Sequence, residues 1–303
     1  MNINHVEIED TFAEAFGMRG ARVIITAESH KWAEIAAREA TGYATSVIAC
    51  DCEAGVERCL DPAETPDGRP GVSCLFFAFS REALQKALMG RLGQCVMTCA
   101  TTAAYNGLPV TEKAVKVGNQ LRFFGDGWQS SKKLGGRRFW RIPVMEGEFL
   151  IEETFGVQNG IAGGNFLILG RSAAATLAAA EAAVEAMRQV PDQVLPFPGG
   201  IVRSGSKVGS RYKFLKASTN DAYAPSLAGR PGSALPEGVN SVLEIVIDGL
   251  TLQAVQAATR AGILAATAMP DIVRITAGNY GGGLGPYLIH LHEVLADAPE
   301  VTA

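Results

Sequence analysis

The stretch FPGGIVRSGSKVGSRYKF, residues 197–214, combines four glycines, three serines and four cationic side chains. Arg203, Lys207 and Arg211 recur every four residues, but the glycines between them oppose a helix. Glycines let backbone N–H groups approach a ligand closely, serines donate hydrogen bonds, and the cations supply positive charge. This composition therefore predicts a flexible loop that binds an anion.

Known phosphate-binding motifs do not fit this stretch. Gly200 and Gly205 have the spacing of a P-loop, but Ser206 and Lys207 stand in the reverse of the required order, and GxGxxG is missing. A second glycine-rich stretch, TAGNYGGGLG at 276–285, follows another predicted strand. The two stretches predict one binding cleft with two walls, and the alternative is a pair of hairpin turns with solvated charges.

Glu244 is the candidate acid. On a strand, Leu243, Ile245 and Ile247 would face a covering helix, and Glu244 would face the other way. In a buried cleft, desolvation would raise the pKa of its carboxyl and keep it protonated near neutrality. On an open face Glu244 would be an ordinary surface acid, and the sequence alone favours this second interpretation.

The other acidic residues and the histidines are weaker candidates for catalysis than Glu244. The stretch EIEDTFAEAF (7–16) carries four carboxylates that could do acid–base work, but its pattern favours an exposed, acidic first turn of a helix capped by Asp10 or Thr11. The four histidines, two of them in IHLH, have no recognisable Ser-His-Asp partners.

The cysteines predict no zinc site. Their spacings are not those of a paired CxxC signature, and they lie in apolar, strand-like runs. We expect them to be reduced, buried, small apolar side chains, with a metal or redox site as the alternative. The six are Cys50, Cys52, Cys59, Cys74, Cys95 and Cys99.

Composition excludes several classes of protein. The chain has 303 residues, 48% hydrophobic residues and 19% charged residues, which fit a packed globular protein rather than a disordered one. The net charge of -4 argues against nucleic acid as a partner. Without an apolar run of about 18 residues or a recognisable signal peptide, we expect no membrane span and a cytoplasmic protein.

The pattern along the chain alternates strands and helices. Each half contains two β-α-β units of similar length, which favours an α+β fold of two ferredoxin-like lobes. Strands are expected at 21–27, 45–51, 72–79, 94–100, 164–170, 194–202, 241–249, 271–280 and 286–294, and helices at 29–43, 80–93, 172–190 and 251–269.

The expected domains follow from this pattern. Residues 1–100 form an N-terminal ferredoxin-like lobe, residues 101–163 a connecting β-rich segment, and residues 164–303 a C-terminal ferredoxin-like lobe. Helices on one face of each sheet leave the other face for a partner, so we expect a homo-oligomer, a dimer or a tetramer.

Many stretches in register resemble one family, the formylmethanofuran–tetrahydromethanopterin formyltransferases. The similarity runs from about residue 3 to residue 294. It is carried by IEDTFAEAF, TPDGRPG, RLGQCVMTC, FFGDG, GIAGGNF, PFPGGIV, SGSKVGSRYKF, ASTND, EIVIDG and AGNYGGGLG.

The resemblance implies a reaction and its substrates. It implies transfer of a formyl group between the amine of methanofuran and N5 of tetrahydromethanopterin, or its dephospho-analogue, with no bound metal or prosthetic group. Glu244 matches the family's catalytic glutamate, and the transfer would pass through a tetrahedral intermediate.

The resemblance also explains the cationic stretch. Both substrates carry acidic tails, which a glycine-rich loop bearing cations suits. The implied substrate-binding residues are Gly199, Gly200, Arg203, Ser204, Ser206, Lys207, Arg211 and Asn279.

Three positions depart from the family's pattern. Ala100 and Gly17 stand where proline is expected, and Ala224 replaces a frequent cysteine. With its low content of charged residues, the chain is more similar to the family members of methylotrophic bacteria. This closer resemblance implies hydrolase subunits as partners in a formyltransferase/hydrolase complex. The alternative function is a non-catalytic ligand-binding or scaffold subunit of such a complex.

Overall fold

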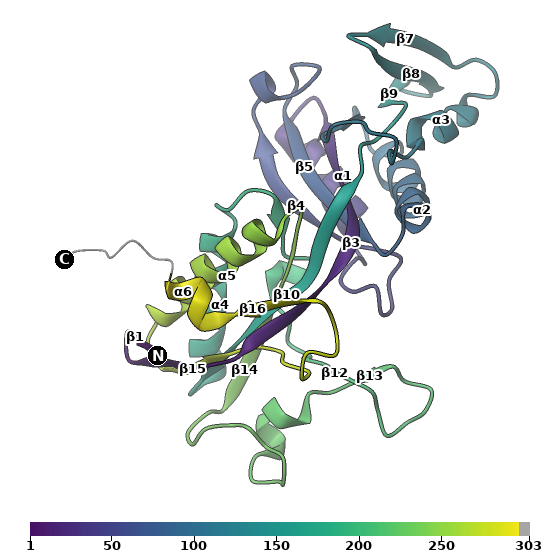
Figure 1. Ribbon diagram of the computed structural model, residues 1–303. Coiled ribbons are helices and arrows are strands. Elements are labelled where there is room, and N and C mark those ends of the chain that lie inside the picture. Colours follow the sequence, from purple (N-terminus) through teal and green to yellow (C-terminus); the bar gives the residue numbers. More distant parts are fainter. Residues whose placement is uncertain (297–303) are drawn as a thin grey trace. The chain divides into compact units, whose positions relative to one another are not determined.

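The computed structural model describes residues 1–296, which form helices and β-strands in two compact units (Figure 1). One unit consists of Met1–Gly17 together with the chain from Ile161 onward. The other consists of Met18–Gly160 and is described first.

In the unit of residues 18–160, helices α1 and α2 pack on a sheet with the strand order β4-β5-β3-β6-β9-β8-β7. Only β6 and β9 are parallel neighbours. The elements are β3 (Phe12–Thr26), α1 (His30–Thr41), β4 (Glu53–Leu60), β5 (Gly71–Ala78), α2 (Arg81–Arg91), β6 (Ala103–Asn106), α3 (Val117–Leu121), β7 (Ser130–Leu134), β8 (Arg137–Val144) and β9 (Gly147–Glu152).

In the other unit, helices α4 and α5 pack together on a sheet with the strand order β11-β14-β10-β15-β2-β1. The short hairpin β12-β13 forms a separate two-stranded sheet. The elements are β1 (Asn2–Ile3), β2 (Val6–Ile8), β10 (Gln158–Gly170), α4 (Ala173–Met187), β11 (Gln193–Val194), β12 (Lys207–Val208), β13 (Ala217–Ser218), β14 (Ser241–Gly249), α5 (Leu252–Thr267), β15 (Ile272–Thr276), β16 (Tyr287–His290) and α6 (Leu291–Ala296).

The boundaries of these compact units differ from the predicted domain boundaries, which divide the chain into 1–100, 101–163 and 164–303. The division into three domains remains a prediction. Two long strands, β3 and β10, each contribute residues to both units. The sequence pattern suggested strands of about seven residues, so it placed no boundary inside a strand.

Three predicted helices begin with a side-chain N-cap. The side chains of Ser80, Ser172 and Thr251 each accept a hydrogen bond from the backbone N–H three residues further on. These bonds satisfy donors that the first helical turn would leave free. Ser29 occupies the N-cap of α1 without such a bond, and Gly42 is the C-cap.

Two predicted strands are wrong. Residues 45–51 form turns, in which the Ser46 carbonyl accepts hydrogen bonds from two later N–H groups. A π-helical turn at Leu92–Val96 extends α2, and the residues from 97 to 100 form turns, so 94–100 is not a strand. Short apolar runs are compatible with either structure. None of residues 45–51 is buried, and Val96 enters the core from a helical turn and not from a strand.

Three further predictions need correction. Residues 7–16 contain no helical turn, because Phe12 begins the long strand β3. The predicted strand 194–202 is reduced to β11 and a bridge at Val202, since the intervening prolines cannot donate to a ladder. The predicted strand 286–294 is β16 followed by α6.

Candidate active site

Glu244 lies on β14 with the predicted alternation. Ile245 and Ile247 are fully buried in the core that α4 and α5 cover, and Leu243 packs against the same core. Glu244 therefore points to the opposite face of the sheet, as expected from a two-residue period.

Apolar neighbours flank Glu244 across the sheet. Leu167 of β10 is its partner on one side. On the other side Val202 forms an isolated bridge, with backbone hydrogen bonds of 2.7 Å to the C=O and 3.0 Å to the N–H of Glu244. The carboxyl is thus placed between two aliphatic side chains by ordinary strand pairing.

Burial raises the pKa of the Glu244 carboxyl to about 7. Within residues 1–296, no side-chain or backbone donor contacts this carboxyl, so nothing compensates the loss of water around its charged form. The side chain keeps partial contact with solvent. The buried interpretation, and not the ordinary surface acid, describes this residue.

The first glycine-rich stretch brings Val202 to this strand. Gly199 and Gly200 have φ values of 66° and 83° in a tight turn. A Cβ on Gly200 would lie 3.0 Å from side-chain atoms of Leu195 and Val184. Gly200 therefore has a packing reason for lacking a side chain, and its predicted contact with substrate stays a prediction.

The predicted cations lie on and beside the β12-β13 hairpin. Arg203 and Arg211 are exposed, whereas Lys207 forms an ion pair with Asp221. This hydrogen-bonded ion pair lowers the pKa of Asp221. Asp221 was not singled out from the sequence, and it moderates the positive charge that the loop can offer to an anion.

Two of the three serines of the stretch, Ser204 and Ser206, are exposed too. Ser204 and Ser206 carry no side-chain hydrogen bond in the described part of the chain. The backbone carbonyl of Ser206, in contrast, accepts a hydrogen bond of 3.0 Å from the Tyr280 hydroxyl. The two glycine-rich stretches thus meet through this one bond.

Asn279 stabilises its own loop. Its side-chain oxygen accepts a hydrogen bond from the Gly281 N–H at 2.8 Å, and its side-chain nitrogen donates to Thr11 at 3.1 Å. Asn279 is exposed, so its predicted role in substrate binding remains a prediction.

Tyr280 was missed by the sequence analysis. Burial, and then the nearby carboxylates of Glu244 and Glu14, raise the pKa of its hydroxyl to about 12. Tyr280 therefore stays protonated at neutral pH. Its position as the one aromatic residue in TAGNYGGGLG was the available signal.

Glu14 was also missed as an individual residue. Its side chain is fully buried, and its carboxylate accepts hydrogen bonds from the N–H groups of Tyr280, Gly282 and Leu284. Burial opposes ionisation of this group, but the backbone donors outweigh it and lower the pKa. Glu14 is thus an internal anion.

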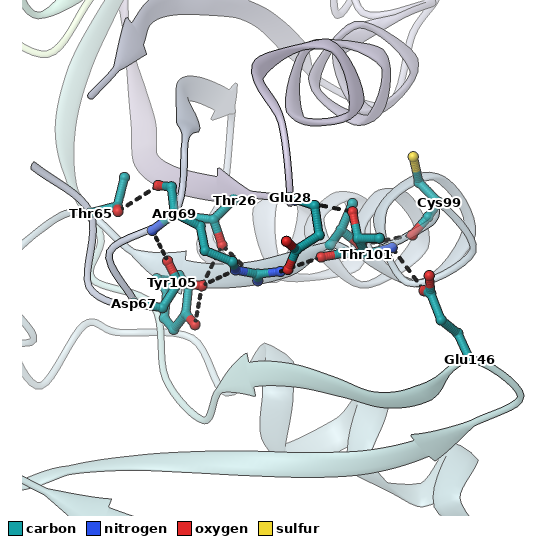
Figure 2. A network of polar contacts seen from close by, with 10 residues as sticks. Thr26, Glu28, Thr65, Asp67, Arg69, Cys99, Thr101, Tyr105 and Glu146 are labelled. Atoms are coloured by element: carbon teal, nitrogen blue, oxygen red, sulfur yellow. Dashed lines mark hydrogen bonds and ion pairs between the residues drawn. The ribbon is translucent and has the colours of Figure 1, made fainter. Parts of the chain in front are cut away.

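A separate polar network lies in the unit of residues 18–160 (Figure 2). One carboxylate oxygen of Asp67 accepts hydrogen bonds from Thr26 at 2.7 Å, Arg69 at 2.9 Å and Tyr105 at 2.9 Å. The Arg69 guanidinium also donates to the carbonyl of Thr101 at 2.5 Å. Arg69 thus bonds Asp67, Thr26 and Thr101 at once, which is typical of a structural network.

The cysteines are only partly as predicted. Cys52 and Cys74 are fully buried, Cys59 is exposed, and the other three are intermediate. Burial raises the pKa of Cys52 to about 12, which keeps it a neutral thiol. Among residues 1–296, no group of three or more His, Cys, Asp or Glu side chains is arranged to hold a metal ion.

None of the helices within residues 1–296 is long and apolar enough to cross a bilayer.

Two family models match the chain. The model described as formylmethanofuran-tetrahydromethanopterin formyltransferase matches residues 1–144, and the model of the proximal lobe matches residues 147–294.

Curated proteins and solved structures agree with these models. The chain is 58% identical to a formylmethanofuran–tetrahydromethanopterin formyltransferase of Methylococcus capsulatus, over 98% of this chain and 100% of that protein. The corresponding enzyme structure from Methanosarcina barkeri has a TM-score of 0.93 at 53% identity, covering 97% of this chain and 100% of that one. A chain of the formyltransferase/hydrolase complex from Methylorubrum extorquens, solved with methylofuran, has a TM-score of 0.95 at 51% identity, covering 97% of this chain and 98% of that one.

Proposed function

Because this chain belongs to the formylmethanofuran–tetrahydromethanopterin formyltransferase family, we propose that it is an enzyme that transfers a formyl group between the amine of methanofuran and N5 of tetrahydromethanopterin, or of its dephospho-analogue. The observation that carries the proposal is the match of both family models across almost the whole chain. The donor-free, half-buried carboxyl of Glu244 supplies a group suited to this chemistry.

Glu244 acts as the acid in this proposal. The acceptor nitrogen forms a bond to the formyl carbon, and the bond from that carbon to the donor nitrogen breaks. In the tetrahedral intermediate between these steps, negative charge lies on the formyl oxygen. Protonated Glu244 can donate a hydrogen bond to this oxygen or a proton to the departing nitrogen. The attacking amine releases a proton, which restores the acid.

The pKa of Glu244 suits both halves of this cycle. A value of about 7 leaves protonated and ionised forms present together at neutral pH. An ordinary carboxyl, with a pKa of 4.5, would be almost fully ionised and would repel the developing oxyanion.

The acidic tails of the substrates have a natural place on the cationic hairpin. Arg203 and Arg211 are exposed and form no ion pair within residues 1–296, whereas Lys207 forms an ion pair with Asp221. We therefore propose that the two arginines contribute more to tail binding than Lys207 does. The remaining proposed contacts are Gly199, Gly200, Ser204, Ser206 and Asn279.

Fold and assembly complete the proposal. The strand orders β4-β5-β3-β6 and β11-β14-β10-β15, each with two helices on one face, support ferredoxin-like lobes. A cytoplasmic homo-oligomer, or a subunit that assembles with hydrolase subunits, is the proposed state, since the relative from Methylorubrum extorquens is part of such a complex.

The test is an assay of the purified chain with formylated pterin and methanofuran, in which pterin absorbance follows the transfer. Turnover that Glu244→Ala abolishes supports the proposal. Saturable binding of either substrate without any turnover, under conditions where a characterised relative is active, would instead favour the ligand-binding or scaffold subunit.

A further inference from the structure

The glycine-rich loop at 276–285 directs its backbone donors inward. The N–H groups of Gly282 and Leu284 donate to the two carboxylate oxygens of Glu14 at 2.8 Å and 2.6 Å, and the Tyr280 N–H donates to the first of them. Positive φ angles of 73° and 77° at Gly281 and Gly282 permit this convergence. The loop is therefore an anion nest whose anion is the protein's own side chain.

Other donors of this loop are also engaged. The Gly278 N–H donates to the side chain of Asn165 at 2.6 Å, and the Gly281 N–H donates to Asn279 at 2.8 Å. Five N–H groups thus point to acceptors within the chain, counting those of Tyr280, Gly282 and Leu284. These five are not available to an oxyanion.

What the loop presents to the site is the side chain of Tyr280. Its hydroxyl donates to the Ser206 carbonyl at 3.0 Å, which ties the 276–285 loop to the cationic loop. Ser206 lies four residues after Val202, which forms a bridge with Glu244. Tyr280 therefore anchors the segment that runs from the Glu244 pairing into the cationic loop.

We propose that Glu14 is a positioning residue for the reaction: its buried carboxylate organises the 276–285 loop and thereby places Tyr280 against Ser206, which fixes the segment that pairs with Glu244 through Val202. This role rests on the proposed function of Glu244. Glu14 is too enclosed by its own loop to contact a substrate, because its side chain has no solvent exposure.

Glu14→Gln removes this organisation with little change of shape. An amide keeps one acceptor oxygen and replaces the other with an NH₂ donor, which would face a backbone N–H. Burying unpaired donors is unfavourable, so the loop should move away from β3. Tyr280 would follow, and Glu244 would gain water and a lower pKa.

The experiment compares Glu14→Gln and Tyr280→Phe with Glu7→Gln, a matched control whose exposed carboxylate pairs with Arg274 outside the loop. Amide hydrogen exchange of the peptide covering 278–285 reports the loop directly. We expect faster exchange there in Glu14→Gln, with the helices α4 and α5 unchanged, and normal exchange in Glu7→Gln.

Activity completes the test. In Glu14→Gln we expect kcat/KM to fall roughly 10-fold to 100-fold, the scale of a misplacement of about 1 Å. The pH above which kcat falls should move to a lower value, because Glu244 becomes better hydrated. Tyr280→Phe keeps the ring, so it should lose activity without this shift.

Two results would overturn the proposal. One is unchanged exchange at 278–285 in Glu14→Gln. The other is faster exchange with wild-type kcat/KM and pH profile, which would leave Glu14 a purely structural group. If wild-type protein itself transfers no formyl group, the proposed function fails instead, and the exchange result still reports whether Glu14 holds the loop.

Discussion

Asp67 and Glu244 are two partly buried carboxyl groups, one in each compact unit, and their surroundings differ in hydrogen-bond donors. Three donors converge on one oxygen of Asp67 (Figure 2), and although burial opposes ionisation, these donors lower its pKa. Glu244 has aliphatic strand neighbours instead, and burial raises its pKa to about 7. Burial alone therefore does not predict the state of a carboxyl, and the number of donors does.

Glu14 sharpens this comparison within one unit. It is more deeply enclosed than Glu244, yet its pKa is lowered, because backbone N–H groups of the 276–285 loop surround it. A structural carboxylate is supplied with donors, and Glu244 is not. The carboxyl left without donors in the folded protein is the one suited to exchange protons with a substrate.

The largest expected effect is on turnover at Glu244. If proton transfer is its role, Glu244→Gln should lower kcat by roughly 10² to 10⁴ with little change in KM. If a hydrogen bond to the formyl oxygen suffices, Gln should retain much of the activity, and Ala should not. Steady-state kinetics of both variants separate these cases.

Near-wild-type kcat in both variants would remove Glu244 from the mechanism. The pH dependence provides a second check, since an essential protonated carboxyl requires kcat to decline as pH rises through about 7.

The same substitution should have the opposite effect on stability. In the folded protein the pKa of Glu244 is about 7, against an ordinary 4.5. The native state therefore binds the proton more tightly, and the stability that protonation contributes is complete below 4.5 and lost as pH rises to about 7. Above that pH the ionised carboxyl lowers the free energy of unfolding by up to about 3 kcal/mol.

Glu244→Gln should escape this loss. We expect its melting temperature relative to wild type to rise between pH 4.5 and pH 8, with wild type and variant measured in the same buffers. A constant difference across this range would show that the carboxyl titrates normally, and the contrast with Asp67 would disappear.

How far the sequence predicted this site depends on the range of the interactions. Alternation along one strand is enough to place Glu244 on the face opposite Ile245 and Ile247. The caps of Ser80 and Ser172 are equally local. Local patterns of period two and of helix termini need only neighbouring residues, which is why they were predictable.

Long-range pairings were not predictable in the same way. Glu14 meets Leu284 across 270 positions of sequence, and Tyr280 meets Ser206 across 74. Nothing in the local pattern of FAEAF distinguishes Glu14 from a surface acid. The second glycine-rich loop was recognised as important, but the destination of its N–H groups depended on this distant carboxylate.

Asp67 should show the converse behaviour of Glu244 in a stability experiment. Asp67→Asn removes a charged acceptor from Thr26, Arg69 and Tyr105, and should lower the free energy of unfolding by about 2 kcal/mol at pH 7. Since the folded pKa is lowered, the wild-type contribution is present above the ordinary value of 3.8 and lost at more acidic pH.

A matched control is Asp126→Asn. Asp126 is exposed and has a left-handed conformation, with φ of 50°, that asparagine also accepts. Equal stability of Asp67→Asn and Asp126→Asn in urea denaturation would show that the network in Figure 2 contributes nothing measurable.

The smallest expected effect concerns the cationic hairpin, where charges are exposed and screened. Arg211→Ala should raise KM for the substrates with acidic tails by up to about 5-fold at low salt, because exposed charge pairs contribute no more than about 1 kcal/mol. Lys207→Ala should raise KM less, since the Lys207 ammonium is already engaged by Asp221. Both effects should shrink at high ionic strength, where charges are screened beyond about 3 Å at 1 M salt. Arg188→Ala, at the C-cap of α4, provides a control of equal charge change. KM values that rise as much in Arg188→Ala as in Arg211→Ala would show that net charge, and not the hairpin, attracts the tails.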